Sequence, residues 1–482
     1  MSELISLLYP APAAAVSGEV TETIDHDARR ETPVNPFAPK RGEPSGTQTR
    51  LYQVHEGGAR LLRPQWLLTD YSLTEGDRVS VDGREAVTVT AELRPGLAFA
   101  AAHPAFPRMP RPRPDRVTAV VDVELGVLLR CAEFWHGKLV STRELSFTDP
   151  DVELPEDDDR DESRRPSSPA GDAARQLAKG AARFAADAAT SLAAGKLRRT
   201  DAPDDETAMP PLPEDLPSAD GAPASDSLLS LLYASGDREF SATIDRWTNL
   251  QAVTSLLRKA ADKTDVDGLG SLADAVDERG AVHMVTGLRF ATPSRYRVDY
   301  VSGYNKNGLE TVVCDDSSRW RFFPDKVVVW PTGALEDELA ELTSGAWLLG
   351  CLLSGESVTE FGGRPAIRFL ARPGGDYRVN PLMLCEAADV IIDAELGIPL
   401  RIIRYGPETV AERWDELRDV TSSAGDVSPD VPPGVRVVHE TGGLLDLARV
   451  PEPVKTTLRG AGSAARLTAE GVATARRLFG RR

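Results

Sequence analysis

The chain has 482 residues, a formal net charge of −18 and a hydrophobic fraction of 41%. Its length allows about two to four domains with apolar cores, and its acidity argues against nucleic acid as a partner, because phosphate binding needs concentrated Lys and Arg. Its richness in Ala, Arg, Asp and Gly is typical of a high-GC genome.

The N-terminus lacks the features of a signal peptide. Glu3 stands where a basic residue is expected, and the apolar run Leu4–Leu8 ends before Pro10. The chain contains no run of about 18 apolar residues, so we expect no membrane-spanning helix. The sequence therefore predicts a cytoplasmic protein that is at most peripheral to the membrane.

An internal repeat organises the rest of the chain. Residues 121–130 and 392–401 share the pattern D-x-E-L-G-[VI]-x-L-R. Three further matches occur in the same order: Leu7-Leu-Tyr9 then Thr23-Ile-Asp25 with Leu231-Leu-Tyr233 then Thr243-Ile-Asp245, Trp66-Leu-Leu with Trp347-Leu-Leu, and Gly83-Arg84 with Gly363-Arg364. The repeat predicts two diverged copies of one domain, over 1–150 and 227–443. Because the first copy lacks a counterpart of 294–330, we expect it to have lost a pair of central strands.

The repeated D-x-E-L-G motif predicts a β-hairpin. Asp122 and Asp393 can cap a turn by accepting hydrogen bonds from downstream amides, and Gly397 can take the left-handed conformation at its end. Apolar periodicity predicts helices near 228–262 and 333–353. The expected fold is α+β, with two tandem curved antiparallel sheets, or open half-barrels, each covered by helices, and an amphipathic helix after each copy.

The segments between and after the copies have distinct compositions. We expect an acidic, Pro/Ser-rich linker over 151–170, a basic Ala-rich amphipathic helix over 171–200, a disordered acidic linker over 201–226 and a basic amphipathic helix over 444–482. The two basic helices have three interpretations: contact with an anionic membrane, pairing with each other or with a partner helix, or solvation beside the acidic linkers. For the C-terminal helix, the candidate contact residues are Leu458, Arg466, Val472, Arg476, Arg477 and Phe479.

Catalytic motifs are missing from the sequence. The six histidines and four cysteines lack the spacing of a metal site, and there is no Walker A loop, no G-x-S-x-G elbow and no G-x-G-x-x-G after a strand. We therefore expect no enzyme, no metal and no cofactor.

The second copy resembles the LolA/LolB lipoprotein-carrier superfamily, in particular the branch of the RseB sensor domain and the LppX-type lipoproteins. The resemblance rests on Arg295–Tyr300, Ser318–Pro331, Gly363-Arg-Pro-Ala, the hairpin motif and Asp430–Val437. It implies open half-barrels with an apolar cavity that binds lipid or acyl chains; the alternative is a regulatory or scaffolding module that binds a protein partner through the same sheets. The residues that the resemblance suggests for the cavity lining are Trp320, Phe322, Trp330, Trp347, Phe369, Ile391 and Ile403.

Overall fold

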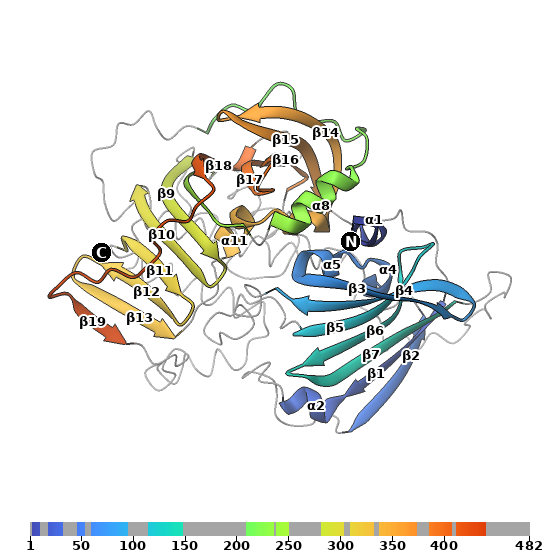
Figure 1. The fold of residues 1–482 in the computed structure, drawn as a ribbon. Coiled ribbons are helices and arrows are strands. Elements are labelled where there is room, and N and C mark those ends of the chain that lie inside the picture. Colours follow the sequence, from blue (N-terminus) through green and yellow to red (C-terminus); the bar gives the residue numbers. More distant parts are fainter. Residues whose placement is uncertain are drawn as a thin grey trace, which may run out of the picture.

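Two large, mainly antiparallel β-sheets with a few short helices make up the part of the chain that the structure describes, as the sequence predicted (Figure 1). The predicted segments 151–170, 171–200 and 444–482, with all six candidate contact residues of the C-terminal helix, lie outside the described residues. The computed structural model describes residues 2–9, 18–31, 46–53, 59–94, 114–147, 209–235, 238–249, 281–302, 309–331, 337–373, 385–406 and 411–439.

The first sheet contains seven strands in the order β2-β1-β7-β6-β5-β4-β3, and each neighbouring pair is antiparallel. Valines and alanines at alternate positions of β4 and β5 are buried, whereas threonines alternate with them, so the sheet packs its core against one face. Its strands are β1 (Gly18–Asp25), β2 (Thr47–Gln53), β3 (Tyr71–Val81), β4 (Arg84–Leu93), β5 (Arg116–Asp122), β6 (Leu128–Trp135) and β7 (Lys138–Phe147). Its helices are α1 (Ser2–Leu8), α2 (His26–Glu31), α4 (Ala59–Leu62) and α5 (Gln65–Asp70).

The second sheet contains twelve strands in the order β14-β15-β16-β17-β18-β8-β9-β10-β11-β12-β13-β19. Only the pairing of β13 with β19 is parallel among its described strand pairs. Its strands are β8 (Phe240–Asn249), β9 (Ala281–Thr292), β10 (Arg295–Ser302), β11 (Thr311–Asp315), β12 (Ser318–Phe323), β13 (Lys326–Pro331), β14 (Cys351–Phe361), β15 (Arg364–Pro373), β16 (Ala387–Asp393), β17 (Pro399–Tyr405), β18 (Ala411–Thr421) and β19 (Arg436–His439). Its helices are α8 (Asp226–Ala234), α11 (Asp337–Thr343) and the 3-10 helix η5 (Ala346–Gly350).

The two sheets share one strand order. The series β3-β4-β5-β6-β7-β1-β2 of the first matches β14-β15-β16-β17-β18-β8-β9 of the second. The register shifts between β3 and β4, β5 and β6, and β6 and β7 recur between β14 and β15, β16 and β17, and β17 and β18. Residues 295–331 extend one end of the second sheet, so the predicted loss of a central pair from the first is wrong. The strand pairing also aligns Val20, rather than Ile24, with Ile244, so the Thr-Ile-Asp match is not a structural one.

The helices are shorter than the periodicity predicted. Helix α8 ends at Ala234, and Ile244 and Trp247, which we expected in the same helix, lie in β8. Their segment alternates side chains as a strand does, with Thr243 and Ile244 adding β-branched residues. The helix expected over 333–353 is divided into α11 and η5, and from Cys351 onward the chain is in β14.

Gly345 lies at this division. A Cβ at Gly345 would lie 2.5 Å from the carbonyl oxygen of Gly397, so the chain here passes close to the neighbouring hairpin turn. Only glycine allows such an approach, and glycine also weakens a helix.

The D-x-E-L-G motif forms the predicted hairpin in both sheets. One carboxylate oxygen of Asp122 accepts hydrogen bonds from the amides of Glu124 and Leu125, each at 2.9 Å. Asp393 caps the second turn in the same way, at 2.8 Å from the amides two and three residues downstream. The glycine that ends each turn has positive φ, 66° in the first and 70° in the second. The capping role predicted for both aspartates is therefore confirmed.

An ion pair connects two of the repeated motifs. The other oxygen of Asp122 accepts from Nε of Arg84, and Asp393 accepts from Nε of Arg364. Both aspartates are fully buried or nearly so. Burial alone would raise the pKa of Asp122, but the bonds from Arg84 and the turn amides outweigh it and hold this pKa below its ordinary value. The Gly-Arg and D-x-E-L-G motifs therefore recur together because their side chains bind each other.

Residues 209–225 lie along the face of the second sheet opposite its main core. Met209 and Leu212 pack against Ile403 and Trp414. Further along, the segment contributes a salt bridge from Asp215 to Arg368 of β15, at 2.8 Å, and a backbone bridge to the edge strand β14. The composition of 201–226 predicted a disordered linker; its described part, 209–225, instead packs on the sheet through these apolar and ionic contacts.

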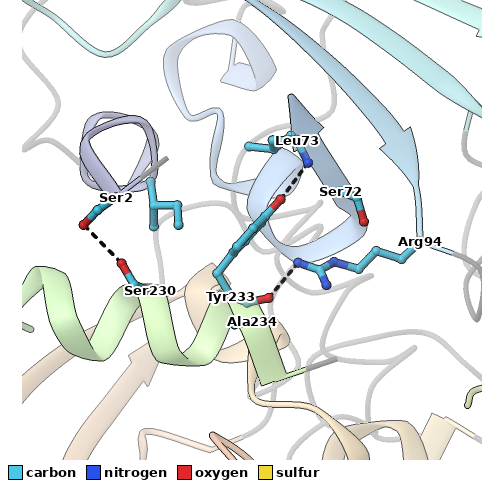
Figure 2. Close-up of a pocket in the computed structure, with 8 residues that line it drawn as sticks. Ser2, Ser72, Leu73, Arg94, Ser230, Tyr233 and Ala234 are labelled. Atoms are coloured by element: carbon cyan, nitrogen blue, oxygen red, sulfur yellow. Dashed lines mark hydrogen bonds between the residues drawn. The ribbon is translucent and has the colours of Figure 1, made fainter. Parts of the chain in front are cut away.

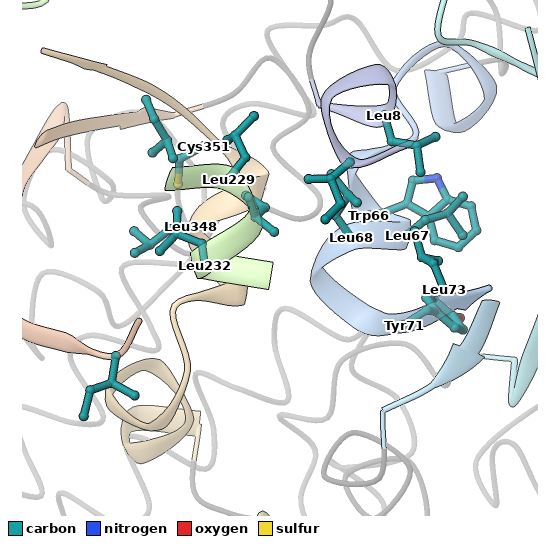
Figure 3. Close-up of a cluster of buried hydrophobic side chains, with 14 of the residues drawn as sticks. Leu8, Trp66, Leu67, Leu68, Tyr71, Leu73, Leu229, Leu232, Leu348 and Cys351 are labelled. Atoms are coloured by element: carbon teal, nitrogen blue, oxygen red, sulfur yellow. The ribbon is translucent and has the colours of Figure 1, made fainter. Parts of the chain in front are cut away.

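The largest apolar cluster lies where the two sheets meet (Figure 3). Leu8 and Leu67 face Leu229 and Leu348 across the junction. Helix α1 packs on α8, and α5 packs on η5. Among the described residues, no helix has both the length and the apolar composition needed to cross a bilayer.

Candidate functional site

A pocket of about 520 Å³ lies at the junction, between α1, β3 and α8 (Figure 2). Ile5 and Leu73 give it apolar walls, and Arg94 is the one charged residue among its described lining residues. Its volume is within the usual range for small-molecule sites, roughly 300–1,000 Å³. The remaining lining residues are Ser2, Ser72, Ser230, Tyr233 and Ala234.

Tyr233 fixes the wall of this pocket. Its hydroxyl accepts a hydrogen bond from the amide of Leu73, at 2.6 Å, and donates one to the carbonyl of Tyr71, at 3.4 Å. Strand β3 is the edge of its sheet, so these two backbone groups face away from the neighbouring strand. A side chain from α8 therefore takes the place that a further strand would occupy.

Arg94 is held against the same tyrosine. Its Nη2 donates to the carbonyl oxygen of Tyr233, at 3.0 Å, and its guanidinium carbon lies 4.7 Å from the centre of the Tyr233 ring. A guanidinium over an aromatic face is favoured by the charge distribution of the ring. The pocket therefore presents a fixed cation beside apolar walls, an arrangement that suits a ligand with an anionic head and an apolar body.

Tyr9 makes the corresponding contact on the second sheet. Its hydroxyl donates to the carbonyl of Cys351 and accepts from the amide of Leu353, both at 2.9 Å. Burial raises the pKa of Tyr9, so the phenol keeps its proton and stays a donor.

Asp415 is a fully buried charged group at the centre of the second sheet. It accepts hydrogen bonds from Arg246 at 2.5 Å, Arg404 at 3.0 Å and Arg413 at 2.8 Å. Burial opposes its ionisation, but the three arginines outweigh that effect and hold the pKa of Asp415 well below the ordinary value. A carboxylate that is permanently charged and saturated with donors has no proton to exchange, so its role is structural.

The described cysteines and histidines do not form a reactive centre. Burial raises the pKa of the Cys351 thiol to about 12 and that of Cys385 well above its ordinary value, which keeps both as unreactive thiols. His283 bonds Asp245 at 2.9 Å and stacks on Trp247, with ring centres 4.3 Å apart. No group of His, Cys, Asp and Glu within the described stretches could hold a metal ion.

The predicted lining residues fall into separate places. Phe369 is buried in the main core, and Trp347 packs against that core with Arg404 over its ring. Ile391 and Ile403 belong to two clusters on the opposite face of the sheet.

The other three lie in the strands that extend the second sheet. Trp320 and Phe322 are partly exposed in β12, where the Trp320 indole donates to Asp315 at 2.8 Å, and Trp330 lies in β13 opposite Arg319. The predicted residues whose side chains the structure describes are therefore divided among these separate places, and none of the seven lines the junction pocket.

No family model and no curated protein matches the chain. Among solved structures, an uncharacterized conserved protein from Thermus thermophilus is 12% identical, with 44% of this chain and 97% of that one covered and a TM-score of 0.25. MucB in the MucA/MucB complex from Pseudomonas aeruginosa is 16% identical over 43% of this chain and 59% of that one, with a TM-score of 0.23. A LolA superfamily protein from Nitrosomonas europaea is 8% identical over 42% and 94%, with a TM-score of 0.18.

The sequence did contain one signal for the junction pocket. The repeated Leu-Leu-Tyr motif places Tyr9 and Tyr233 at the ends of two short helices. However, the apolar face of an amphipathic helix predicts packing against the sheet of its own domain, not against another sheet. Nothing in the local sequence distinguishes Arg94, which is partly buried, from the other arginines of the chain.

Proposed function

We propose that the chain is a non-catalytic binding protein whose ligand is an amphiphile with an anionic head and an acyl or similarly apolar body, held in the junction pocket. The observation that carries this proposal is the single fixed cation, Arg94, beside apolar walls in a pocket of about 520 Å³. An acyl chain needs a connected space of about 300 Å³ or more. The volume of the junction pocket exceeds that value, and the pocket is partly open to solvent.

The direction of binding follows from the lining. The carboxylate or phosphate of the ligand would lie at Arg94 and the hydroxyl of Ser72, while its apolar part would lie against Ile5 and Leu73 (Figure 2). Hydrogen bonds to a charged group contribute about 1.5–3 kcal/mol, so removal of the guanidinium should weaken binding by roughly ten- to a hundredfold.

Titration of the full chain with dodecanoate and dodecyl phosphate by calorimetry tests the proposal. Arg94→Gln should lower the affinity for both probes, and Ser72→Phe should block binding by filling the pocket. Arg130→Gln is the matched control, because Arg130 pairs with Glu144 at 3.6 Å on an exposed surface. If wild type binds neither probe, or if Arg94→Gln binds as wild type does, the pocket is not the site.

A protein partner is the second candidate, and exposed apolar side chains on edge strands favour it. Leu51 on β2 is 63% exposed and Val358 on β14 is 89% exposed, and each strand lies at the edge of its sheet. Edge strands recruit extended peptides by backbone pairing. Backbone pairing along β2 would be blocked by Leu51→Pro and left intact by Leu51→Thr. Co-purification of a partner with wild type and Leu51→Thr but not with Leu51→Pro would support this alternative.

A further inference from the structure

The contacts between the two sheets are reciprocal. Ser2 of α1 lies 3.2 Å from Ser230 of α8, and Ser6 of α1 donates to Asp226 of α8 at 2.7 Å. When residues 2–9 are aligned with residues 226–233, Ser2 matches Asp226 and Ser6 matches Ser230. The two hydrogen bonds therefore join equivalent pairs of positions, once in each direction. In a two-fold symmetric interface, residue i of one subunit contacts residue j of the other, and j contacts i.

The tyrosine contacts follow the same rule. Tyr9 binds the first and third residues of β14, and Tyr233 binds the first and third residues of β3. In the same alignment Tyr9 matches Tyr233, and β3 matches β14 in the strand order. Each half of the chain therefore uses its helix to satisfy the edge strand of the other half.

The helices that make these contacts are also alike in sequence. Residues 2–9 read Ser-Glu-Leu-Ile-Ser-Leu-Leu-Tyr and residues 226–233 read Asp-Ser-Leu-Leu-Ser-Leu-Leu-Tyr. Five of the eight positions are identical, the buried pair Ile5 and Leu229 are both aliphatic, and the first two positions, which are exposed, differ. The shared residues are therefore the ones that the interface needs.

A buried ion cluster supports the same correspondence with its charges reversed. In the first sheet, Arg143 of β7 lies opposite Glu22 of β1, and it bonds Glu22 at 2.8 Å and Glu133 of β6 at 3.0 Å. In the second sheet, Asp415 of β18 lies opposite Arg246 of β8 and bonds that residue.

Arg404 of β17 completes the reversal. Arg404 precedes the register shift between β17 and β18, and Glu133 precedes the matching shift between β6 and β7. Arg404 bonds Asp415 as Glu133 bonds Arg143. The central residue and these two partners therefore carry opposite charges in the two sheets, whereas Arg413, the third partner of Asp415, matches the uncharged Ser141. An ion cluster kept at one place in the fold with these three charges inverted is expected of two descendants of one unit.

We infer that the junction is an isologous interface between two descendants of one sheet-and-helix unit, a homodimer that has become a single chain. The surface formed by α1, α5 and the start of β3 fits the surface formed by α8, η5 and the start of β14, and no covalent connection is needed to hold them. Burial supports this: Leu4, Leu8, Leu228 and Leu232 in the two helices are at most 2% exposed.

The first test cuts the connection in the folded protein. A protease site is introduced between residues 148 and 208 of the full chain, the chain is cut, and native mass spectrometry and size-exclusion chromatography follow the two pieces at about micromolar concentration. The pieces should stay together as a one-to-one complex. If they separate, the junction is an incidental contact between tethered domains and the inference is wrong.

Matched variants test the reciprocity. Tyr9→Phe and Tyr233→Phe should each raise the dissociation constant of the cut pieces about tenfold, because each removes a hydroxyl that satisfies two backbone groups. Tyr405→Phe, outside the junction, should leave it unchanged. A strong effect from only one of the two junction variants would contradict an isologous interface.

Exchange of residues 2–9 with residues 226–233 in the full chain tests the common origin. The exchanged chain should keep the wild-type melting temperature and the association of the cut pieces, whereas an exchange shifted by one residue should lose both. Equal failure of the two exchanges would overturn the equivalence of the helices.

Discussion

Replacement of Asp415 with Asn would remove the negative charge that three buried arginines share. These arginines come from three adjacent strands, β8, β17 and β18, so the carboxylate ties the centre of the second sheet together. The loss of one partner from a buried ion pair costs about 3–5 kcal/mol, because the remaining charge stays buried without compensation. We expect a loss toward the lower end, because Arg404 keeps its ion pair with Glu341 at 2.6 Å. That is a large part of the roughly 5–15 kcal/mol that stabilises a domain.

Urea unfolding of the full chain measures this effect. Trp247 and Trp414 lie in the same sheet, with ring centres 6.4 Å apart, so tryptophan fluorescence reports on its unfolding. Asp215→Asn is the matched control, because Asp215 pairs with Arg368 on the exposed side of the segment 209–225; its midpoint should match wild type. A midpoint for Asp415→Asn equal to that of the control would refute the reasoning.

Acid should produce the same loss in the wild type. The arginines hold the folded-state pKa of Asp415 well below that of an unfolded aspartate, about 3.9. Its stabilisation is therefore complete above that unfolded value and declines as the pH falls toward the folded pKa. Between about pH 6 and pH 3, the difference in midpoint between wild type and Asp415→Asn should shrink. A difference in midpoint that grew on acidification would contradict a lowered folded-state pKa for Asp415.

Three other predictions concern different parts of the chain. Gly126→Ala and Gly397→Ala should each lower the stability by about 1–3 kcal/mol in thermal unfolding, because both have positive φ and the new Cβ would lie 2.4 and 2.6 Å from a helix carbonyl oxygen; an unchanged melting temperature would contradict the turn geometry. Cys351 should resist iodoacetamide at pH 8 until denaturant is added, because its pKa of about 12 leaves little thiolate, as peptide mass spectrometry would show. Deletion of 451–482 should weaken co-sedimentation with anionic vesicles and leave neutral ones unaffected; equal binding would assign this segment to another role.

The sequence predicted the local chemistry of the fold better than its helices or its site. Asp393 and Gly397 act within a few residues of chain, so their roles follow from the motif alone. The length of α8 was overestimated because apolar spacing over a short stretch fits both a helix and the strand β8.

The candidate site depends on contacts that no local pattern reveals. Tyr9 contacts β14 across 344 residues of sequence, and Tyr233 contacts β3 across 160. The resemblance implies a half-barrel, and it therefore predicts cavity residues on one sheet. The pocket instead depends on two sheets meeting through helices that belong to opposite halves of the chain.

The course of residues 209–225 has a practical consequence for dissection of the protein. The repeat suggests starting a second-domain fragment at residue 227, where the sequence similarity begins. Such a fragment would lack Met209 and Leu212, which cover Ile403 and Trp414, and its newly bare apolar surface would favour aggregation. A fragment that begins before Met209 would keep the sheet covered on that side, so the recombinant boundary should follow the packing rather than the repeat.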